Sequence, residues 1–229
     1  DKYENVLVLQ VSTLGMHVRL GEIIGALPAA GLSFDSIILR TDTAMAHLEG
    51  FPEEHRVLTG EYTPPLRIEQ DGLLFDVDVL EGQKTGFFLD QRENRLATAN
   101  FFAGRTVLDC FSYSGSWALY AGRAGAKKVS GVDSSSRAVE AARRNAELNS
   151  LESICGFEEA DVFERLSQMA ASGDQYDCII LDPPALVKSK RHLHQGEAAY
   201  EKLNRLAMKL LSPDGILISC SCSYHVSRE

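Results

Sequence analysis

The sequence predicts an α/β fold: a parallel sheet covered by helices, preceded by a small α+β domain. From about residue 105, short apolar runs alternate with longer amphipathic segments. Polar or glycine-containing turns follow these apolar runs. The first third lacks this alternation and instead contains Asp71-Gly72 between two apolar runs, a strong hairpin signal. These observations place the two domains at residues 1–80 and 81–229.

Residues 1–80 are expected to form one helix and four strands. Apolar residues at helical spacing predict the helix over residues 17–27, and Pro28 ends it. Runs of β-branched and apolar residues predict the strands. Their expected ranges are 6–11, 36–40, 66–70 and 73–80. Nothing in this domain demands catalysis.

The second domain is expected to alternate strands with helices. The strands are expected at residues 106–111, 128–132, 154–159, 177–181 and 215–221. The helices are expected at residues 116–124, 136–149, 162–171 and 197–211. Strands separated by helices pair in parallel through right-handed crossovers. Ligands of such sheets bind beyond the carboxyl ends of the strands, where the strand order reverses.

Composition limits the class of protein. The 229 residues are 45% hydrophobic and 24% charged, which is too apolar for a disordered chain. The sequence contains no run of about 18 apolar residues, so it predicts no membrane-spanning helix. The five cysteines are odd in number and their spacings fit no zinc site. We therefore expect reduced thiols in a cytoplasmic protein, and no metal site.

Acidic residues are concentrated in the first domain. The net charge is −9, and residues 1–80 contain 5 Lys and Arg against 13 Asp and Glu, a balance of −8. Residues 81–229 are nearly balanced and hold a basic stretch between residues 186 and 209. Its basic members are Lys188, Lys190, Arg191, Lys202, Arg205 and Lys209. Such a patch can bind phosphate, although charge alone favours a solvated helix face.

The turn after the strand at residues 106–111 has the features of a nucleotide-like cofactor site. Asp109 lies at the end of the strand, and a tight turn then leads into a helix. The turn residues are Phe111, Ser112, Tyr113, Ser114 and Gly115. Backbone N–H groups at such a turn approach a ligand closely, and the helix start favours an anionic group. A single glycine, in place of G-x-G-x-x-G, argues against NAD or FAD.

Two more acids follow the next two strands. Asp133 lies 18 residues beyond Gly115, where a carboxylate can accept both hydroxyls of a ribose. Asp161 follows the third strand and could accept from an adenine amino group. The alternative for Asp161 is a helix N-cap. Three acids at three successive strand ends favour a cofactor site.

Two later strand ends indicate the chemistry. Asp182 is followed by Pro183-Pro184, which form a rigid lip rather than more strand. The fifth strand is expected to contain Cys220 and Cys222 on one face, with Cys222 nearer the ligand edge. A cysteine is most often a small buried apolar residue. We assign that role to Cys110, Cys155 and Cys178, but not to Cys222.

Four segments together resemble a known family. They are Gly82 to Arg95, the Asp109 to Gly115 turn, Asp182-Pro183-Pro184 and Ser221-Cys222-Ser223. The chain resembles the large-subunit ribosomal RNA cytosine-5 methyltransferases along its whole length. The family has a PUA domain, a central α/β domain and a Rossmann-like class I methyltransferase domain that uses S-adenosyl-L-methionine. The resemblance implies ribosomal RNA as the partner and no association with a membrane. It also implies Arg92 as a further cofactor-binding residue. The oligomeric state stays open, and a homodimer is one possibility.

The resemblance also implies roles for individual residues. Cys222 would add to carbon 6 of cytosine as the nucleophile. Asp182, also at the cofactor, would face the cytosine N3 and amino edge as a protonated acid. Lys84 would lower the thiol pKa or contact phosphate. The target base must leave its stack, and Phe87, Phe88 or Tyr224 could stack on it. For Phe87 and Phe88, core packing is the alternative.

The chain also departs from the family pattern. No PUA domain precedes Asp1, and we expect the sheet to be truncated after its fifth strand, with weakened catalysis as the consequence. Ala185 stands where some RNA cytosine methyltransferases have a second cysteine. Two other functions remain open at this point. One is a guanine or small-molecule methyltransferase in which Cys222 is structural, and the other is a binding module without turnover.

Overall fold

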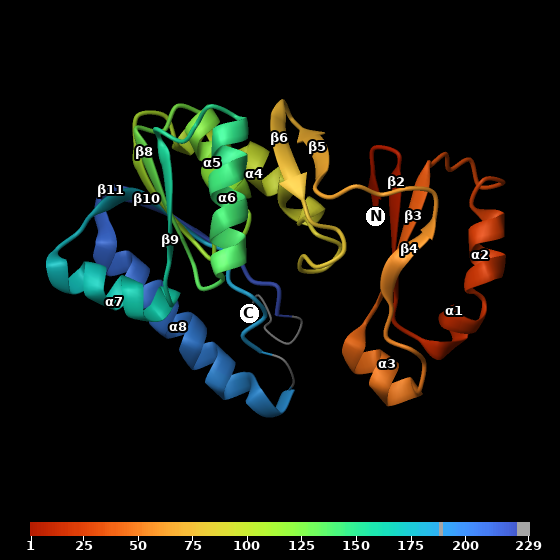
Figure 1. Cartoon of the computed structure of the whole chain (residues 1–229). Coiled ribbons are helices and arrows are strands. Elements are labelled where there is room, and N and C mark those ends of the chain that lie inside the picture. Colours follow the sequence, from red (N-terminus) through yellow and green to blue (C-terminus); the bar gives the residue numbers. More distant parts are fainter. Residues whose placement is uncertain (188–189, 224–229) are drawn as a thin grey trace. The chain divides into compact units, whose positions relative to one another are not determined.

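The computed structural model describes residues 1–187 and 190–223, with no side-chain description at residue 190 (Figure 1). The chain forms two compact units, Asp1–Asp90 and Gln91–Glu229. This division lies ten residues after the boundary expected from the sequence. In the described part of the chain, no helix is long and apolar enough to cross a membrane.

The first unit contains a four-stranded sheet and a separate hairpin. The sheet has the order β1-β2-β3-β4, in which β2 and β3 are parallel and the outer pairs are antiparallel. Its strands are β1 (Lys2–Tyr3), β2 (Val6–Val11), β3 (Ser36–Thr41) and β4 (His55–Thr59). The hairpin joins β5 (Leu66–Gln70) to β6 (Leu73–Val77). Asp71 and Gly72 have φ of 53° and 76°, as the hairpin signal requires.

The helices of the first unit differ from the expectation. The helix expected at residues 17–27 is divided into α1 (Leu14–Val18) and α2 (Leu20–Ala26), because Arg19 leaves the helical conformation at ψ 8°. α3 (Thr43–Glu49) was not predicted, and neither was β4. Asp42 caps the start of α3 by accepting from the Met45 N–H, and Gly50 ends it at φ 74°.

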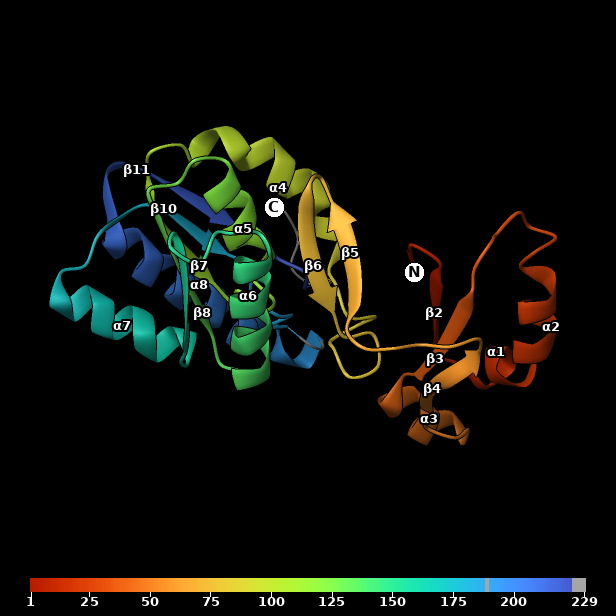
Figure 2. The same ribbon diagram turned by 45° about the horizontal axis from the view of Figure 1, so that its top comes forward.

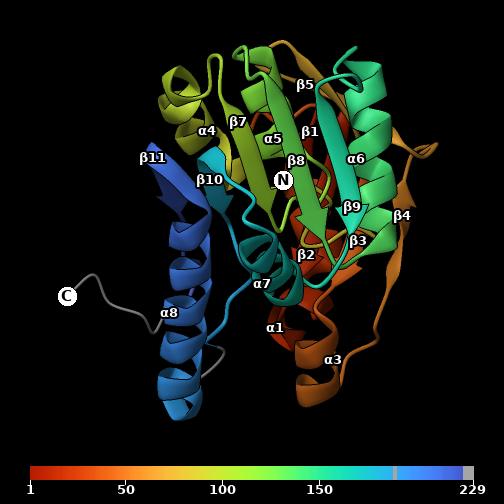
Figure 3. The ribbon, with the colours of Figure 1, turned by 90° about the vertical axis from the view of Figure 1, so that its left-hand side faces the viewer.

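The second unit is built on a five-stranded parallel sheet with the order β11-β10-β7-β8-β9 (Figure 3). Its strands are β7 (Thr106–Cys110), β8 (Lys128–Asp133), β9 (Cys155–Glu159), β10 (Tyr176–Leu181) and β11 (Leu211–Ser219). The chain runs outward from β7 to β9 and then returns to β10 on the other side of β7. The strand order therefore reverses between β7 and β10, as the predicted Rossmann-like α/β fold requires.

Helices cover both faces of this sheet (Figures 1 and 2). α4, α5 and α6 lie on one face, and α7 and α8 on the other. Their bounds are α4 (Arg92–Thr98), α5 (Ser116–Arg123), α6 (Ser136–Leu148), α7 (Val162–Ser172) and α8 (Leu193–Leu210). A buried cluster fills the space between the sheet and α7 and α8, with Leu108, Ile179 and Leu203 fully buried. This packing fixes the strand ends that carry the candidate site.

The fifth strand was predicted with the wrong bounds. It runs over Leu211–Ser219, so it begins and ends earlier than the expected range of 215–221. Cys220 continues the pairing by one bond, from its N–H to the Leu181 carbonyl at 2.8 Å. Cys222 lies beyond the strand. The argument that Cys220 and Cys222 share one strand face is therefore wrong.

Candidate functional site

The loop between β7 and α5 passes three times through left-handed backbone. Phe111, Tyr113 and Gly115 have φ of 64°, 47° and 82°. A non-glycine residue in this region is strained by about 1–3 kcal/mol, and such strain persists only where the surroundings impose it. The N–H groups of Phe111 and Ser112 both donate to the Val132 carbonyl, at 2.9 and 3.1 Å. The end of β8 therefore holds the loop in this shape.

Asp133 completes that restraint. It is half-buried at the end of β8, and its Oδ2 accepts from the Tyr113 N–H at 2.9 Å. Its Oδ1 accepts from the Ser135 N–H at 3.0 Å. Each carboxylate oxygen has a second lone pair. Asp133 can thus hold the loop and still accept hydrogen bonds from two ligand hydroxyls.

Polar side-chain atoms in and next to this loop are available to bind a ligand. Ser112 Oγ, Ser114 Oγ and Asp109 Oδ1 are buried, and no hydrogen-bond partner is found for them among the described residues. Buried polar groups in native proteins are nearly always paired. The site therefore has unused hydrogen-bonding capacity where the sequence predicts the cofactor. These atoms have the chemistry to bind a polar, ribose-bearing group such as S-adenosylmethionine.

Close packing keeps the loop in place from below. A Cβ added at Gly131 would lie 2.4 Å from Phe157 Cδ1, and one added at Gly115 would lie 2.9 Å from Phe157 Cζ. Both distances are shorter than real contacts allow. The ring of Phe157 on β9 therefore requires glycine at both positions, which the sequence supplies.

Asp109 points inward. It is fully buried in β7, and its Oδ2 accepts from the Ala118 N–H at 3.1 Å. Burial raises the pKa of its carboxyl well above the ordinary value, and the nearby charge of Asp182 raises the pKa further. Burial and this charge therefore both favour the protonated form of Asp109. Its contact with the cofactor stays a prediction.

Asp161 is the N-cap of α7. Its exposed carboxylate accepts from the Glu164 N–H at 2.9 Å. This is the alternative that the sequence offered to an adenine contact. Oδ1 makes the capping bond, and an adenine contact of this carboxylate stays a prediction.

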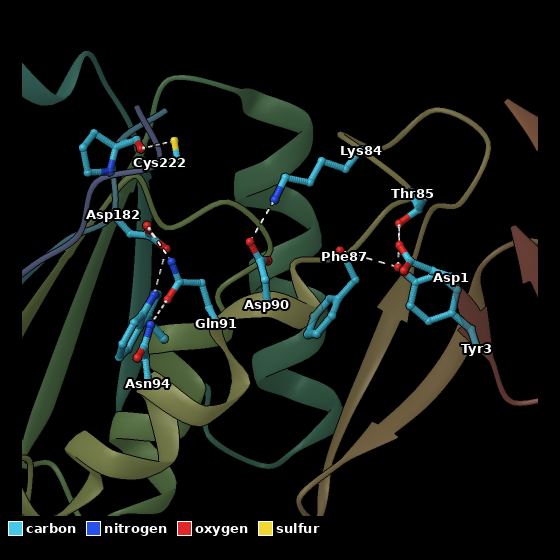
Figure 4. Close-up of polar contacts among 12 residues, drawn as sticks. Asp1, Tyr3, Lys84, Thr85, Phe87, Asp90, Gln91, Asn94, Asp182 and Cys222 are labelled. Atoms are coloured by element: carbon cyan, nitrogen blue, oxygen red, sulfur yellow. Dashed lines mark hydrogen bonds and ion pairs between the residues drawn. The ribbon is translucent and has the colours of Figure 1, made fainter. Parts of the chain in front are cut away.

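Asp182 lies just beyond β10 and accepts from two side chains of other elements. Trp117 Nε1 on α5 donates to Oδ2 at 3.0 Å, and Gln91 Nε2 donates to Oδ1 at 3.3 Å. Gln91 is itself held by Asn94, whose amide donates to Oε1 at 2.8 Å (Figure 4). Donors on both oxygens favour the ionised form. The expected role of Asp182 as a protonated acid stays a prediction.

Cys222 lies beside Pro183 at the ends of the two neighbouring strands. Its thiol donates to the Pro183 carbonyl oxygen at 3.6 Å, and the residue is exposed (Figure 4). Cys220 is less exposed, and burial, followed by the charge of Asp182, raises the pKa of its thiol to about 12. Because the thiolate is the reactive form, the raised pKa disfavours Cys220, and the greater exposure favours Cys222.

The other three cysteines are buried apolar residues, as predicted. Cys110, Cys155 and Cys178 are at most 3% exposed. Burial raises the pKa of the Cys155 and Cys178 thiols to about 12 and that of Cys110 well above its ordinary value.

The predicted residues of the Gly82 to Arg95 segment are divided between the two units. Lys84 belongs to the first unit, where its ammonium lies 3.1 Å from an Asp90 carboxylate oxygen and 4.3 Å from the centre of the Phe88 ring. Arg92 is exposed at the start of α4 in the second unit, 3.8 Å from Glu93. The catalytic role of Lys84 and the cofactor role of Arg92 stay predictions.

Phe87 is a core residue. It is 2% exposed, and its ring lies 4.9 Å from that of Phe75, so the core-packing alternative is confirmed for it. Phe88 is half-buried. Tyr224, also considered for stacking, lies outside the described residues.

The basic stretch is only partly described. Lys188 and the side chain of Lys190 lie outside the described residues. Arg205 forms an ion pair with Glu201 on the same face of α8, and Lys202 lies 5.5 Å from the centre of the Phe163 ring. These contacts are those of a solvated helix face.

Sequence reasoning missed three side chains of the site. Gln91 and Trp117 hold Asp182, and Tyr200 on α8 hydrogen-bonds to the serines on either side of Cys222. Trp117 is the one tryptophan in the sequence and follows the predicted cofactor turn, which is a usable signal. Tyr200 has no local signal, because its partners are more than twenty residues away.

Comparisons with known proteins agree with this geometry. A family model of S-adenosylmethionine-dependent methyltransferases matches residues 44–227. A ribosomal RNA large subunit methyltransferase I from Pseudoalteromonas translucida (strain TAC 125) is 41% identical over 97% of this chain. The corresponding protein from Serratia proteamaculans (strain 568) is 40% identical over 97%. The chain spans 57% of the length of each of these two relatives.

Solved structures share the fold. A SAM-dependent methyltransferase from Streptococcus mutans has a TM-score of 0.84 and 25% identity, covering 98% of this chain and 57% of its own. A methyltransferase solved in complex with SAH has a TM-score of 0.83 and 24% identity, covering 99% of this chain and 58% of its own. The second likeness shows the fold alone.

The predicted methyltransferase class and the predicted cofactor, S-adenosylmethionine, are thereby confirmed. A Rossmann-like sheet, a restrained loop after β7 and a carboxylate at the end of β8 are the features by which this class would hold its cofactor. The family match covers about half of the first unit and nearly all of the second. The chain belongs to the S-adenosylmethionine-dependent methyltransferase family.

Proposed function

We propose that this protein methylates carbon 5 of a cytosine in large-subunit ribosomal RNA, with Cys222 as the nucleophile. One observation carries the chemistry: an exposed thiol lies 3.6 Å from the Pro183 carbonyl oxygen, at the strand end next to that of Asp182. The names of the relatives at 40 and 41% identity support ribosomal RNA as the substrate. Methyl transfer to an amino group needs no thiol at this position, because the acceptor nitrogen is itself the nucleophile.

The chain would hold its cofactor at the ends of β7 and β8. Asp133 would accept the ribose hydroxyls, and the turn of Ser112 to Gly115 would present its backbone N–H groups and serine hydroxyls. Phe111 and Tyr113, with their left-handed backbone, shape this turn. When bound, S-adenosylmethionine supplies the methyl group from its sulfonium sulfur. Asp182 would face this group from the end of β10.

Cys222 performs the covalent step. Carbon 5 of cytosine is a poor nucleophile until the Cys222 thiolate adds to carbon 6 and gives the ring enamine character. The new bond is between sulfur and carbon 6, and the ring electrons are then available at carbon 5 for the methyl group. Loss of the proton from carbon 5 restores the double bond and expels the thiolate. Cys222 ends as the thiolate in which it began, the methyl group replaces the proton of carbon 5, and that proton passes to a base.

Asp182 orients the base in this proposal. With Trp117 and Gln91 donating to its two oxygens, the Asp182 carboxylate would accept a hydrogen bond from the cytosine 4-amino group. The 4-amino group of cytosine is a donor, whereas the same position of uracil is an acceptor. Asp182 would thus favour cytosine over uracil.

Analysis of the methylated product tests the proposal. The protein is incubated with large-subunit ribosomal RNA and S-adenosylmethionine carrying a labelled methyl group, and the RNA is digested to nucleosides for mass spectrometry. We expect the label in 5-methylcytidine. Label in a methylguanosine would replace the proposal with the guanine alternative. No label in any nucleoside, with the cofactor bound, would indicate a binding module.

Two cysteine variants complete the experiment. Cys222→Ala should lower the methylation rate by more than about 10³-fold, the order of magnitude expected when a covalent nucleophile is removed. Cofactor affinity, measured by calorimetry, should be unchanged. Cys220→Ala is the matched control, because it removes a neighbouring thiol whose pKa of about 12 keeps it protonated. It should retain most of the activity.

A further inference from the structure

A single hydroxyl group links the two residues that flank Cys222. Tyr200 is half-buried on α8, and its Oη lies 2.9 Å from Ser223 Oγ. Ser221 Oγ donates to the same Oη at 3.2 Å. β11 ends at Ser219, so strand pairing does not hold the 221–223 segment. Tyr200 therefore contacts the segment on both sides of the thiol.

The buried end of this segment is hydrogen-bonded to a residue that packs against α8. Ser223 is 6% exposed, and its Oγ accepts from the Val187 N–H at 3.1 Å. Val187 packs tightly on α8, because a Cβ added at Gly196 would lie 2.2 Å from Val187 Cγ2. α8 therefore packs closely against Val187, and the Tyr200 hydroxyl of the same helix contacts the two serines.

We propose that Tyr200 is a positioning residue for Cys222: its hydroxyl fixes the 221–223 segment so that the thiol stays at the Pro183 carbonyl oxygen, beside Asp182. The assignment rests on the proposed role of Cys222 as nucleophile. The thiol must approach carbon 6 of the base while Asp182 holds the amino edge. A displacement of about 1 Å in such an arrangement lowers the rate steeply. A segment outside the sheet needs this restraint more than a strand residue does.

Tyr200→Phe tests the proposal, because it removes the hydroxyl and keeps the aromatic ring. RNA containing 5-fluorocytosine is the probe, since fluorine at carbon 5 cannot leave as a proton and the thiolate stays bound to carbon 6. The adduct should form about 10-fold more slowly than with the unmodified protein, equivalent to about 1.4 kcal/mol. Cofactor affinity and the RNA concentration at half-maximal rate should not change. Tyr176→Phe, which removes another half-buried tyrosine hydroxyl, should leave the rate unchanged.

Amide hydrogen exchange gives a readout that does not depend on the proposed function. Exchange at residues 186–187 and 221–223 should accelerate in Tyr200→Phe and not in Tyr176→Phe. Unchanged exchange would overturn the proposal, as would accelerated exchange with an adduct rate equal to that of the unmodified protein. If the unmodified protein forms no adduct, the function of Cys222 fails, and the exchange rates still decide whether Tyr200 restrains this segment.

Discussion

The ends of β7 and β8 and the ends of β10 and β11 lie along one edge of the same sheet, but they are built by different means. At β7 and β8, backbone groups form the site: left-handed residues shape the loop, and Asp133 accepts from two backbone N–H groups. At β10 and β11, side chains from helices form it. Trp117 and Gln91 hold Asp182, and Tyr200 contacts the serines around Cys222.

We expect this difference to separate cofactor binding from methyl transfer. The backbone-built part is rigid, and it would hold a cofactor that many methyltransferases share. The part built from side chains would face the methyl acceptor, where each contact can be removed without disturbing the loop after β7. Substitutions at β8 should therefore change cofactor affinity, and substitutions at the contacts of Asp182 should change the rate of methylation.

Among the variants that separate cofactor binding from methyl transfer, the largest effect is expected at Asp133. Asp133→Ala removes the acceptor for two ribose hydroxyls, and a hydrogen bond to a charged group contributes about 1.5–3 kcal/mol. Calorimetry should show S-adenosylmethionine binding at least about 10-fold more weakly. Asp174→Ala, an acid before the amino end of β10, is the control and should bind normally. Unchanged affinity in Asp133→Ala would remove the end of β8 from the cofactor site.

A smaller effect is expected when Asp182 loses a donor. Trp117→Phe keeps an aromatic ring and removes the indole N–H that donates to Asp182 at 3.0 Å. The methylation rate should fall about 10-fold, at the lower end of the range for a hydrogen bond to a charged group. Cofactor affinity should stay within about threefold. A parallel loss of affinity would show that the two parts of the site are not separable.

The effect furthest from the chemistry concerns the packing beneath the cofactor loop. Gly131→Ala places a Cβ 2.4 Å from Phe157 and should lower the free energy of unfolding by about 1–3 kcal/mol. Gly156→Ala on the neighbouring strand is the control, because no atom lies within 4 Å of its added Cβ. It should be neutral or stabilise by up to about 1 kcal/mol. Equal unfolding free energies for the two variants would mean that Phe157 does not support the loop.

The same contrast explains what the sequence could predict. Strand–helix alternation, Asp133 and the turn at Ser112 to Gly115 are local patterns, so the strands β7 to β10 and the cofactor loop were predicted close to their observed bounds. α3 and β4 were missed because α3 is short and β4 exposes most of its side chains. The contacts of Asp182 and Cys222 come from residues 21 to 91 positions away. No local pattern encodes them.

The end of β11 illustrates the limit most clearly. The serines and cysteines of residues 219–223 continue a β-like pattern, yet pairing stops after Cys220, where its N–H meets the Leu181 carbonyl. Pro183, two residues beyond β10, has no N–H to continue a ladder. Cys222 is thereby released from the strand, and the thiol turns to the Pro183 carbonyl oxygen.

The position of the covalent bond between protein and RNA directly tests whether Cys222 is the nucleophile. The protein is incubated with S-adenosylmethionine and ribosomal RNA containing 5-fluorocytosine, digested with nuclease and protease, and the peptide that carries the nucleotide is sequenced by mass spectrometry. We expect a nucleotide on Cys222 and on no other cysteine. A nucleotide on Cys220, or continued methylation of normal RNA without any adduct to fluorinated RNA, would contradict it.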